Sequence, residues 1–179
     1  KTSGGSAKES KHAGKRDDWW NDAVQGENKP NSEFPFEADD ADHAETPTEA
    51  YRDVAAVLGR LAECLGRTRA TLRIYDPYYC QGGVVKRLQQ HGFKRVYNRC
   101  EDFYAMADAG RVPEYDVLLT NPPYSEDHFE RIVKYCVGSG RPWMLLVPNF
   151  IYTKDFYKEH VLGSEAQRAC MYLVPKKRY

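Results

Sequence analysis

The sequence lacks several features that would assign its function class directly. Its 179 residues contain no run of about 18 apolar residues, so we expect no membrane-spanning helix. The five cysteines are an odd number and form neither a CxxC pair nor a cluster with histidine, which argues against a disulfide framework or a zinc site. We therefore expect an intracellular, reducing compartment, the cytoplasm or the nucleus, with an organelle left open.

The sequence also has no excess charge of either sign. It holds 26 Lys and Arg against 26 Asp and Glu, so the overall basic signature of a nucleic-acid-binding protein is missing. Charge is nevertheless segregated, because residues 1–16 are basic and residues 33–53 are strongly acidic. The phosphate-binding pattern GxxxxGK[ST] is absent as well, which disfavours NTP binding.

The composition indicates one domain preceded by a tail. Residues 1–32 are rich in Gly, Ser, Lys and Asn without periodicity, and we expect them to be mostly disordered. Within them, Trp19 and Trp20 are expected to dock onto the domain or a partner. Residues 33–179 are expected to form the domain. Because the chain does not begin with Met and stops inside a strand-like run, we expect it to be a piece of a longer protein.

The pattern predicts a helix that begins at "TPTE" and ends at Gly66. Thr46 can cap this helix, Pro47 suits its first position, and Glu49 completes a capping box. Apolar residues then recur at helical spacing as far as Leu65. One face of the helix is therefore expected to be buried.

Strand-like and helical segments alternate along the rest of the chain. Strands are predicted at 71–77, 93–98, 115–120, 142–148 and 169–175. Helices are predicted at 82–92, after a capping Ser125, and around 153–162, while 99–114 is expected to be irregular. This alternation predicts an α/β fold with a doubly wound parallel sheet, in which the strands at 115–120 and 142–148 are buried on both faces.

Two loops are predicted at the carboxyl ends of strands, where such sheets bind ligands. The first is "DPYYCQGG" (76–83), whose glycines let a ligand approach the backbone and whose following helix favours a negative group. The second is "NPPYS" (121–125). The side-chain oxygen of Asn121 and the carbonyl oxygen of Pro122 can together receive both hydrogens of a planar amino group. That arrangement favours attack by the nitrogen on an electrophile.

Two further residues complete this interpretation of the second loop. Tyr124 offers a flat face on which a base can stack, and Pro123 helps to hold the geometry before the reaction. The alternative is a strand exit that is merely stiffened by proline and followed by a capping Ser125.

These residues resemble those of a known enzyme family. "TNPPYS" resembles the NPPY catalytic motif of class I, S-adenosylmethionine-dependent amino-methyltransferases, and "IYDPYYCQGG" is similar to their cofactor loop. "ETP" and "CEDF" resemble the family's segments beside the methionine end and the adenine of the cofactor. The resemblance covers about residues 43 to 179, and it implies a Rossmann-like class I methyltransferase sheet.

The resemblance also implies S-adenosyl-L-methionine as cofactor and a role for each matching residue. The implied catalytic residues, which would bind the substrate amine, are Asn121, Pro122, Pro123 and Tyr124. The implied cofactor-binding residues are Thr46, Pro47, Asp76, Pro77, Tyr78, Gly82, Asn98, Glu101, Asp102 and Phe103. No metal is implied, because the sulfonium is already an activated electrophile.

The sequence departs from the family pattern in several places. Asn98 stands where an acidic residue usually binds the ribose hydroxyls, with Glu101 as a substitute, and Cys80 stands where glycine is frequent. The stretch that leads to "EDF" is too short for the usual helix and strand, a compression that resembles minimal adenine methyltransferases of phage and algal-virus type. The closing strand hairpin, expected after "YLVPKKRY", is absent or incomplete.

The expected function is methylation of an exocyclic amino group, the adenine 6-amino group of a nucleic acid, with RNA slightly favoured over DNA. A single-stranded or loop substrate is expected, because a base in a duplex must first be flipped out. Specificity would then come from a protein partner or a missing domain. Methylation of a protein glutamine amide and, as a smaller share, of a guanine 2-amino group are alternatives. A third is a catalytically inactive methyltransferase-fold module in a larger assembly. The histidines without clustered partners, interpreted as structural or surface residues, are His43, His91, His128 and His160.

Overall fold

The computed structural model describes residues 45–125, 127–162, 170–177 and 179. The predictions for the tail, for Trp19 and Trp20, and for His43 lie outside the described residues. None of the helices that the structure describes is both long and apolar enough to cross a membrane.

A parallel sheet of four short strands organises the domain. The strands are β1 (Arg73–Tyr75), β2 (Arg95–Tyr97), β3 (Val117–Thr120) and β4 (Trp143–Leu145). Their order in the sheet is β2-β1-β3-β4, and Ile74 of β1 is paired with Val96 on one side and Val117 on the other. The predicted α/β fold with a parallel sheet is confirmed. Because the strand order reverses between β1 and β3, the carboxyl ends of these two strands form the topological switch point.

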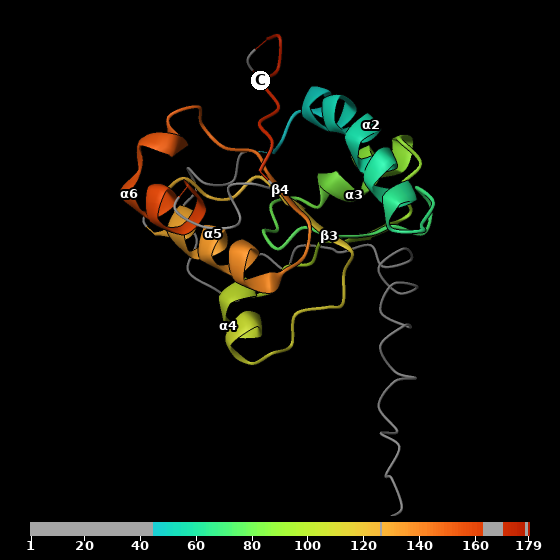
Figure 1. The fold of residues 1–179 in the computed structure, drawn as a ribbon. Helices are drawn as coiled ribbons and strands as arrows, with labels where there is room; N and C mark the ends of the chain where they lie inside the picture. Colours follow the sequence, from blue (N-terminus) through green and yellow to red (C-terminus); the bar gives the residue numbers. More distant parts are fainter. Residues whose placement is uncertain (1–44, 126, 163–169, 178) are drawn as a thin grey trace, which may run out of the picture.

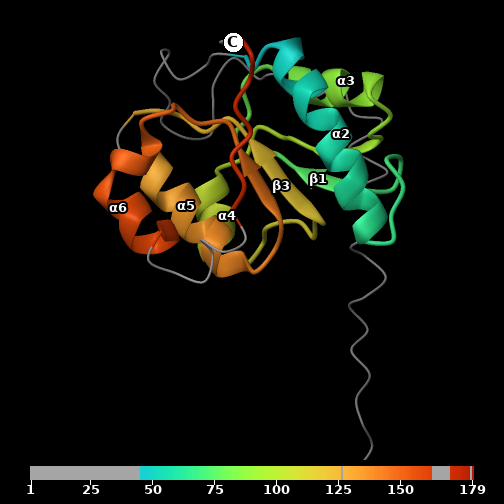
Figure 2. The same ribbon diagram turned by 45° about the horizontal axis from the view of Figure 1, so that its top comes forward.

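Helices cover both faces of the sheet (Figure 1). On one face lie α2 (Thr48–Cys64) and α3 (Gly83–Gln90); on the other lie α4 (Phe103–Asp108) and α5 (His128–Ser139). Figure 2 shows β1 and β3 between these two groups. Three short turns pack beside α5: η3 (Ile151–Thr153), α6 (Asp155–Tyr157) and η4 (Lys158–Leu162). They correspond to the helix predicted around 153–162.

Alternation along the strands divides the core between the two faces. Val117 and Leu119 of β3 belong to the apolar cluster with α2 and α3, whereas Leu118 belongs to the cluster with α4 and α5. The second cluster is rich in aromatic rings, with Tyr75 of β1 in contact with Phe103 of α4 at a ring-centre distance of 6.3 Å. Apolar side chains therefore pack against both faces of the sheet near the switch point.

The predicted starts of two helices are wrong in detail. Pro47, in extended conformation (φ −63°, ψ 152°), is the residue that caps α2, and no side chain caps this helix, so Thr46 lies one residue too early. Similarly, α5 begins at His128 after Asp127 rather than after Ser125. The predicted stop at Gly66 is confirmed, because this residue adopts the left-handed conformation (φ 66°) that glycine favours.

Three further predictions are corrected. The segment expected to be irregular contains α4, whose first turn is capped by Asp102. β4 is half-buried rather than buried, because it lies at an edge of the sheet. The described part of the predicted last strand, residues 170–175, pairs with no other strand, and Met171 and Val174 are 82% and 86% exposed. Apolar residues alone do not make a strand without a neighbour to bond with.

Candidate active site at the switch point

The two loops predicted to meet do start side by side. Asp76 follows β1 directly and Asn121 follows β3 directly, and these strands are neighbours in the sheet. The hydroxyl of Thr120 donates a 2.6 Å hydrogen bond to Oδ1 of Asp76. This bond joins the bases of the two loops.

Asp76 lies in an environment that disfavours its charged form. The residue is only 6% exposed, and burial raises the pKa of its carboxyl to about 7. The nearby Glu45 carboxylate also raises this pKa, while the hydrogen bonds from Thr120 and from the main-chain N–H of Tyr78 lower it. A carboxyl with such a pKa exchanges its proton near neutral pH, which is a common property of functional sites.

Asn98 holds the first loop against the end of β2. Its side-chain nitrogen donates to the main-chain carbonyls of Asp76 (3.1 Å) and Tyr78 (3.2 Å). The structure therefore places Asn98 as a buried support of the loop. The requirement for a donor explains why an amide is suitable here.

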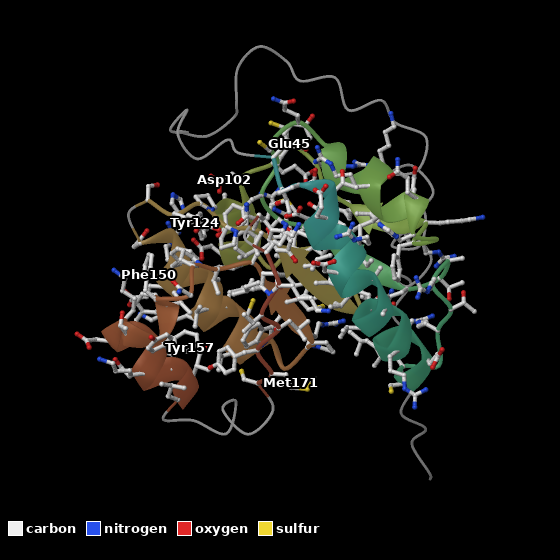
Figure 3. The ribbon with its side chains drawn as sticks, turned by 90° about the horizontal axis from the view of Figure 1, so that it is seen from above. Glu45, Asp102, Tyr124, Phe150, Tyr157 and Met171 are labelled. Atoms are coloured by element: carbon white, nitrogen blue, oxygen red, sulfur yellow. The ribbon has the colours of Figure 1, made fainter. Side chains whose placement is uncertain are left out.

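Glu45 occupies the turn that was expected to favour a ligand's negative group. Its carboxylate accepts hydrogen bonds from the main-chain N–H groups of Gln81 (3.0 Å) and Gly83 (3.3 Å), and it forms an ion pair with Arg87. Figure 3 shows Glu45 near the amino end of α2. The sequence reasoning did not name this residue, although "ETP" was singled out. No local pattern indicates this contact, because Glu45 lies 36 positions before Gln81.

The second loop is organised around Asn121. Tyr124 donates a 2.8 Å hydrogen bond from its hydroxyl to Oδ1 of Asn121, and its ring stacks on Phe129 with centres 4.9 Å apart. Pro122 is fully buried, so its main chain is fixed, and Asn121 remains partly exposed. An amide oxygen can accept a second hydrogen bond, so Oδ1 can bind a donor besides Tyr124.

A chain of side-chain hydrogen bonds connects the first loop, through α4, to the start of α5. The hydroxyls of Tyr78 and Tyr104 are 2.8 Å apart, and the Tyr104 hydroxyl lies 2.7 Å from Nδ1 of His128. The Arg131 guanidinium covers the Tyr104 ring at 3.4 Å. His128 was interpreted as a structural or surface residue. The structure places it at the start of α5, where its ring stacks on Tyr104 and forms the hydrogen bond with the Tyr104 hydroxyl.

The remaining predicted residues have roles of their own within the fold. Oδ1 of Asp102 accepts the N–H of Ala105 (3.0 Å), while Phe103 lies inside the aromatic core. Glu101 accepts a 2.9 Å hydrogen bond from the Tyr97 hydroxyl.

The structure joins only some of the predicted residues directly. Asn98 bonds to Asp76 and Tyr78, Tyr124 bonds to Asn121, and Thr120 links the bases of the two loops. The predicted residues that lie in these loops without a cross-loop contact described above are Pro77, Gly82, Pro122 and Pro123. Thr46 and Pro47, both partly exposed, follow Glu45 beside the glycine turn. Within the described ranges, no group of three or more His, Cys, Asp or Glu side chains is placed to bind a metal ion.

Comparison with models of protein families, with curated proteins and with solved structures gave no match.

Proposed function

We propose that this domain is an S-adenosylmethionine-dependent methyltransferase that acts on an exocyclic amino group. The most suitable substrate is the adenine 6-amino group in a nucleic acid, with RNA slightly favoured over DNA. One observation carries the proposal: the Asn121 loop and the Asp76 loop start from adjacent strands at the switch point and are joined by the 2.6 Å bond from Thr120. This is the location in open α/β sheets where two ligands can meet.

The residues of the first loop fit the amino-acid end of such a cofactor. Glu45 and Arg87 set a carboxylate and a guanidinium side by side at the glycine turn, and these charges complement an ammonium and a carboxylate. Gly82 has φ 75°, which keeps the turn tight without a side chain in the way. When bound, the cofactor supplies a methyl group on a sulfonium, which is an activated electrophile.

The residues of the second loop fit the amine. Oδ1 of Asn121 and the carbonyl oxygen of Pro122 are the acceptors that would receive its two hydrogens. Buried Pro122 fixes one of them and the Tyr124 hydroxyl restrains the other, so little ordering remains to be done when the substrate binds. Tyr124 is 51% exposed and backed by Phe129, which suits it to support a base by stacking.

A second candidate function, a methyltransferase-like module without activity, is supported by a specific observation. Glu45 already satisfies the N–H groups of the glycine turn, and Tyr124 already occupies Asn121, so both loops find partners within the chain. A glutamine amide in a protein remains an alternative acceptor, because the same two oxygens suit its amino group equally well.

The test combines binding with transfer. Calorimetry with S-adenosylmethionine should give measurable binding to the chain, and labelled cofactor should then modify one of three separate pools of RNA, DNA and protein. Label in adenine supports the proposal. Label in glutamine would instead show that the domain methylates a protein glutamine amide. Absence of cofactor binding would favour the inactive module.

A further inference from the structure

A cavity of about 930 Å³ lies on the α4 and α5 face of the sheet, apart from the two loops. Its walls come from the end of β2, from the connection between α4 and β3, and from the carboxyl half of α5. Neither Asn121 nor the residues 76–83 line it. The volume greatly exceeds that of a single ion or water molecule, so it can take an extended ligand.

The charges around this cavity are mainly positive. Four cationic side chains line it: Arg99, Arg111, Lys134 and Arg141. Of the two carboxylates in the wall, Glu114 pairs with Arg73 at 3.1 Å, whereas Glu101 accepts the uncharged Tyr97 hydroxyl and keeps its negative charge.

Most of the positively charged side chains around the cavity have no ion-pair partner among the described residues. Lys134 pairs with Glu130 on its own helix at 2.5 Å. Among the residues that the structure describes, no ion pair involves Arg99, Arg111 or Arg141. In a chain whose formal net charge is zero, this is a local concentration of positive charge.

Aromatic rings hold two of these guanidinium groups in position. Arg99 lies 5.1 Å from the centre of the Tyr97 ring, and Arg141 lies 5.1 Å from the centre of the Tyr115 ring. Arg141 also donates to the main-chain carbonyl of Tyr115. A guanidinium that is restrained on a ring loses less entropy when it binds a phosphate, whose oxygens match its planar donors.

We infer that this cationic groove, defined by Arg99, Arg111, Lys134 and Arg141, binds the phosphodiester backbone of a single-stranded nucleic acid. Its cations come from four separate segments, so they suit a strand with successive phosphates better than a ligand with one phosphate group. The choice of a nucleic acid over another polyanion rests on the proposed function. The anionic class of the ligand follows from the groove itself.

The test is a binding titration of the whole chain with a fluorescent 12-nucleotide RNA, followed by anisotropy at several salt concentrations. Arg111→Glu is the informative variant, because this exposed arginine has no ion pair among the described residues. Arg60→Glu is the matched control, because it makes the same charge change on α2, across the sheet. We expect Arg111→Glu to weaken binding about tenfold and to reduce the salt slope by about 0.7, the value for one lost phosphate contact. Arg60→Glu should change neither.

Equal losses in the two variants would overturn the inference, since they would reflect net charge alone. Displacement of the RNA by millimolar AMP would also overturn it, because the groove would then be a mononucleotide site. Displacement by polyglutamate at equal charge concentration would assign the groove to acidic protein chains instead.

Cofactor calorimetry separates this inference from the proposed function. Cofactor binding with unchanged RNA affinity in Arg111→Glu would refute the groove and leave the methyltransferase proposal standing. RNA binding through the groove without cofactor binding would do the reverse.

Discussion

The hydroxyl of Thr120, at the end of β3, donates a 2.6 Å hydrogen bond to the buried carboxyl of Asp76, just after β1. The bond connects the two loops at their bases, on neighbouring strands. A change in the protonation of Asp76 therefore alters the hydrogen bond of Thr120, the residue directly before Asn121.

Replacement of this donor should be measurable. Thr120→Val keeps the shape of the side chain but leaves the Asp76 carboxyl without the hydroxyl, which should lower the free energy of unfolding by about 1–3 kcal/mol in urea denaturation. Because the lost bond favours the ionised carboxyl, the pKa of Asp76 should rise further. Thr153→Val is a suitable control, since Thr153 is exposed and its hydroxyl bonds only locally to the Phe150 carbonyl. A carboxyl pKa in Thr120→Val equal to that of the wild type would contradict the role of this bond.

Stability should depend on pH through Asp76. Its pKa is raised from 3.8 to about 7 on folding, so between these values the folded state binds more protons than the unfolded state. The free energy of unfolding should therefore fall as the pH rises from about 4 to about 7, by an amount on the order of 4 kcal/mol. Urea unfolding at pH 5 and pH 8 should show about 2.5 kcal/mol of this difference, because part of it lies below pH 5. Asp76→Asn should remove most of it, and a variant with the wild-type profile would show that another group is responsible.

The proposed chemistry depends most directly on Asn121. Asn121→Ala removes one of the two acceptors for the substrate amine, so methyl transfer should fall about 10²–10³-fold, the usual loss when one polar contact to the reacting group is removed. Cofactor affinity, measured by calorimetry, should change less than about twofold, because the first loop is intact. Asn149→Ala, an exposed asparagine after β4, is the control and should keep full activity. Wild-type turnover in Asn121→Ala would refute the assignment.

The glycine turn allows a prediction about Glu45. A Cβ on Gly83 would overlap the Glu45 carboxylate and the Arg87 guanidinium, so Gly83→Ala must displace them from the turn. Because both groups are the ends of flexible side chains, we expect a loss of no more than about 1 kcal/mol in the free energy of unfolding. In a Glu45→Ala background the same substitution should cost much less, which a double-mutant cycle measures. Additive losses would mean that the contact is unimportant.

Gly138→Ala provides the matched control for this substitution. Gly138 lies within α5, and no atom is within 4 Å of the position that its Cβ would take. Alanine at this helical position should raise the free energy of unfolding by about 0.5–1 kcal/mol. A lower free energy of unfolding for Gly83→Ala and a higher one for Gly138→Ala would confirm that the limited space at the turn decides the result. A general effect of replacing glycine would have the same sign in both variants.

Apolar runs and glycine positions predicted the order of most helices and strands, because burial along a strand and the end of a helix depend on neighbouring residues in the sequence. The apolar run that contains β3 indicated a strand covered on both faces, and Gly66 indicated the end of a helix. The six-residue helix α4 was missed because it is too short to show periodicity. The strand predicted at 169–175 failed for the opposite reason. Its composition suits a strand, but a strand also needs a neighbour, and composition does not supply one.

The sequence placed the two loops at one edge but could not give their contacts. The bond from Thr120 to Asp76 joins residues that are 44 positions apart, and Glu45 reaches a turn 36 positions away. Such pairings depend on the strand order, which follows from packing of the whole chain. The four cations of the groove likewise come from four separate segments, so no single stretch of sequence could have indicated it.

The two hydrogen bonds of Asn98 restrict which side chain can stand at position 98. Its two amide hydrogens are shared between two carbonyl groups of one loop, and an ionised aspartate at the same position would present only lone pairs to them. Asn98→Asp would thus set three oxygens against one another and loosen the loop that Asn98 supports. Position 98 therefore requires an amide to keep the first loop in place, and a residue that accepts from a sugar hydroxyl would have to stand elsewhere.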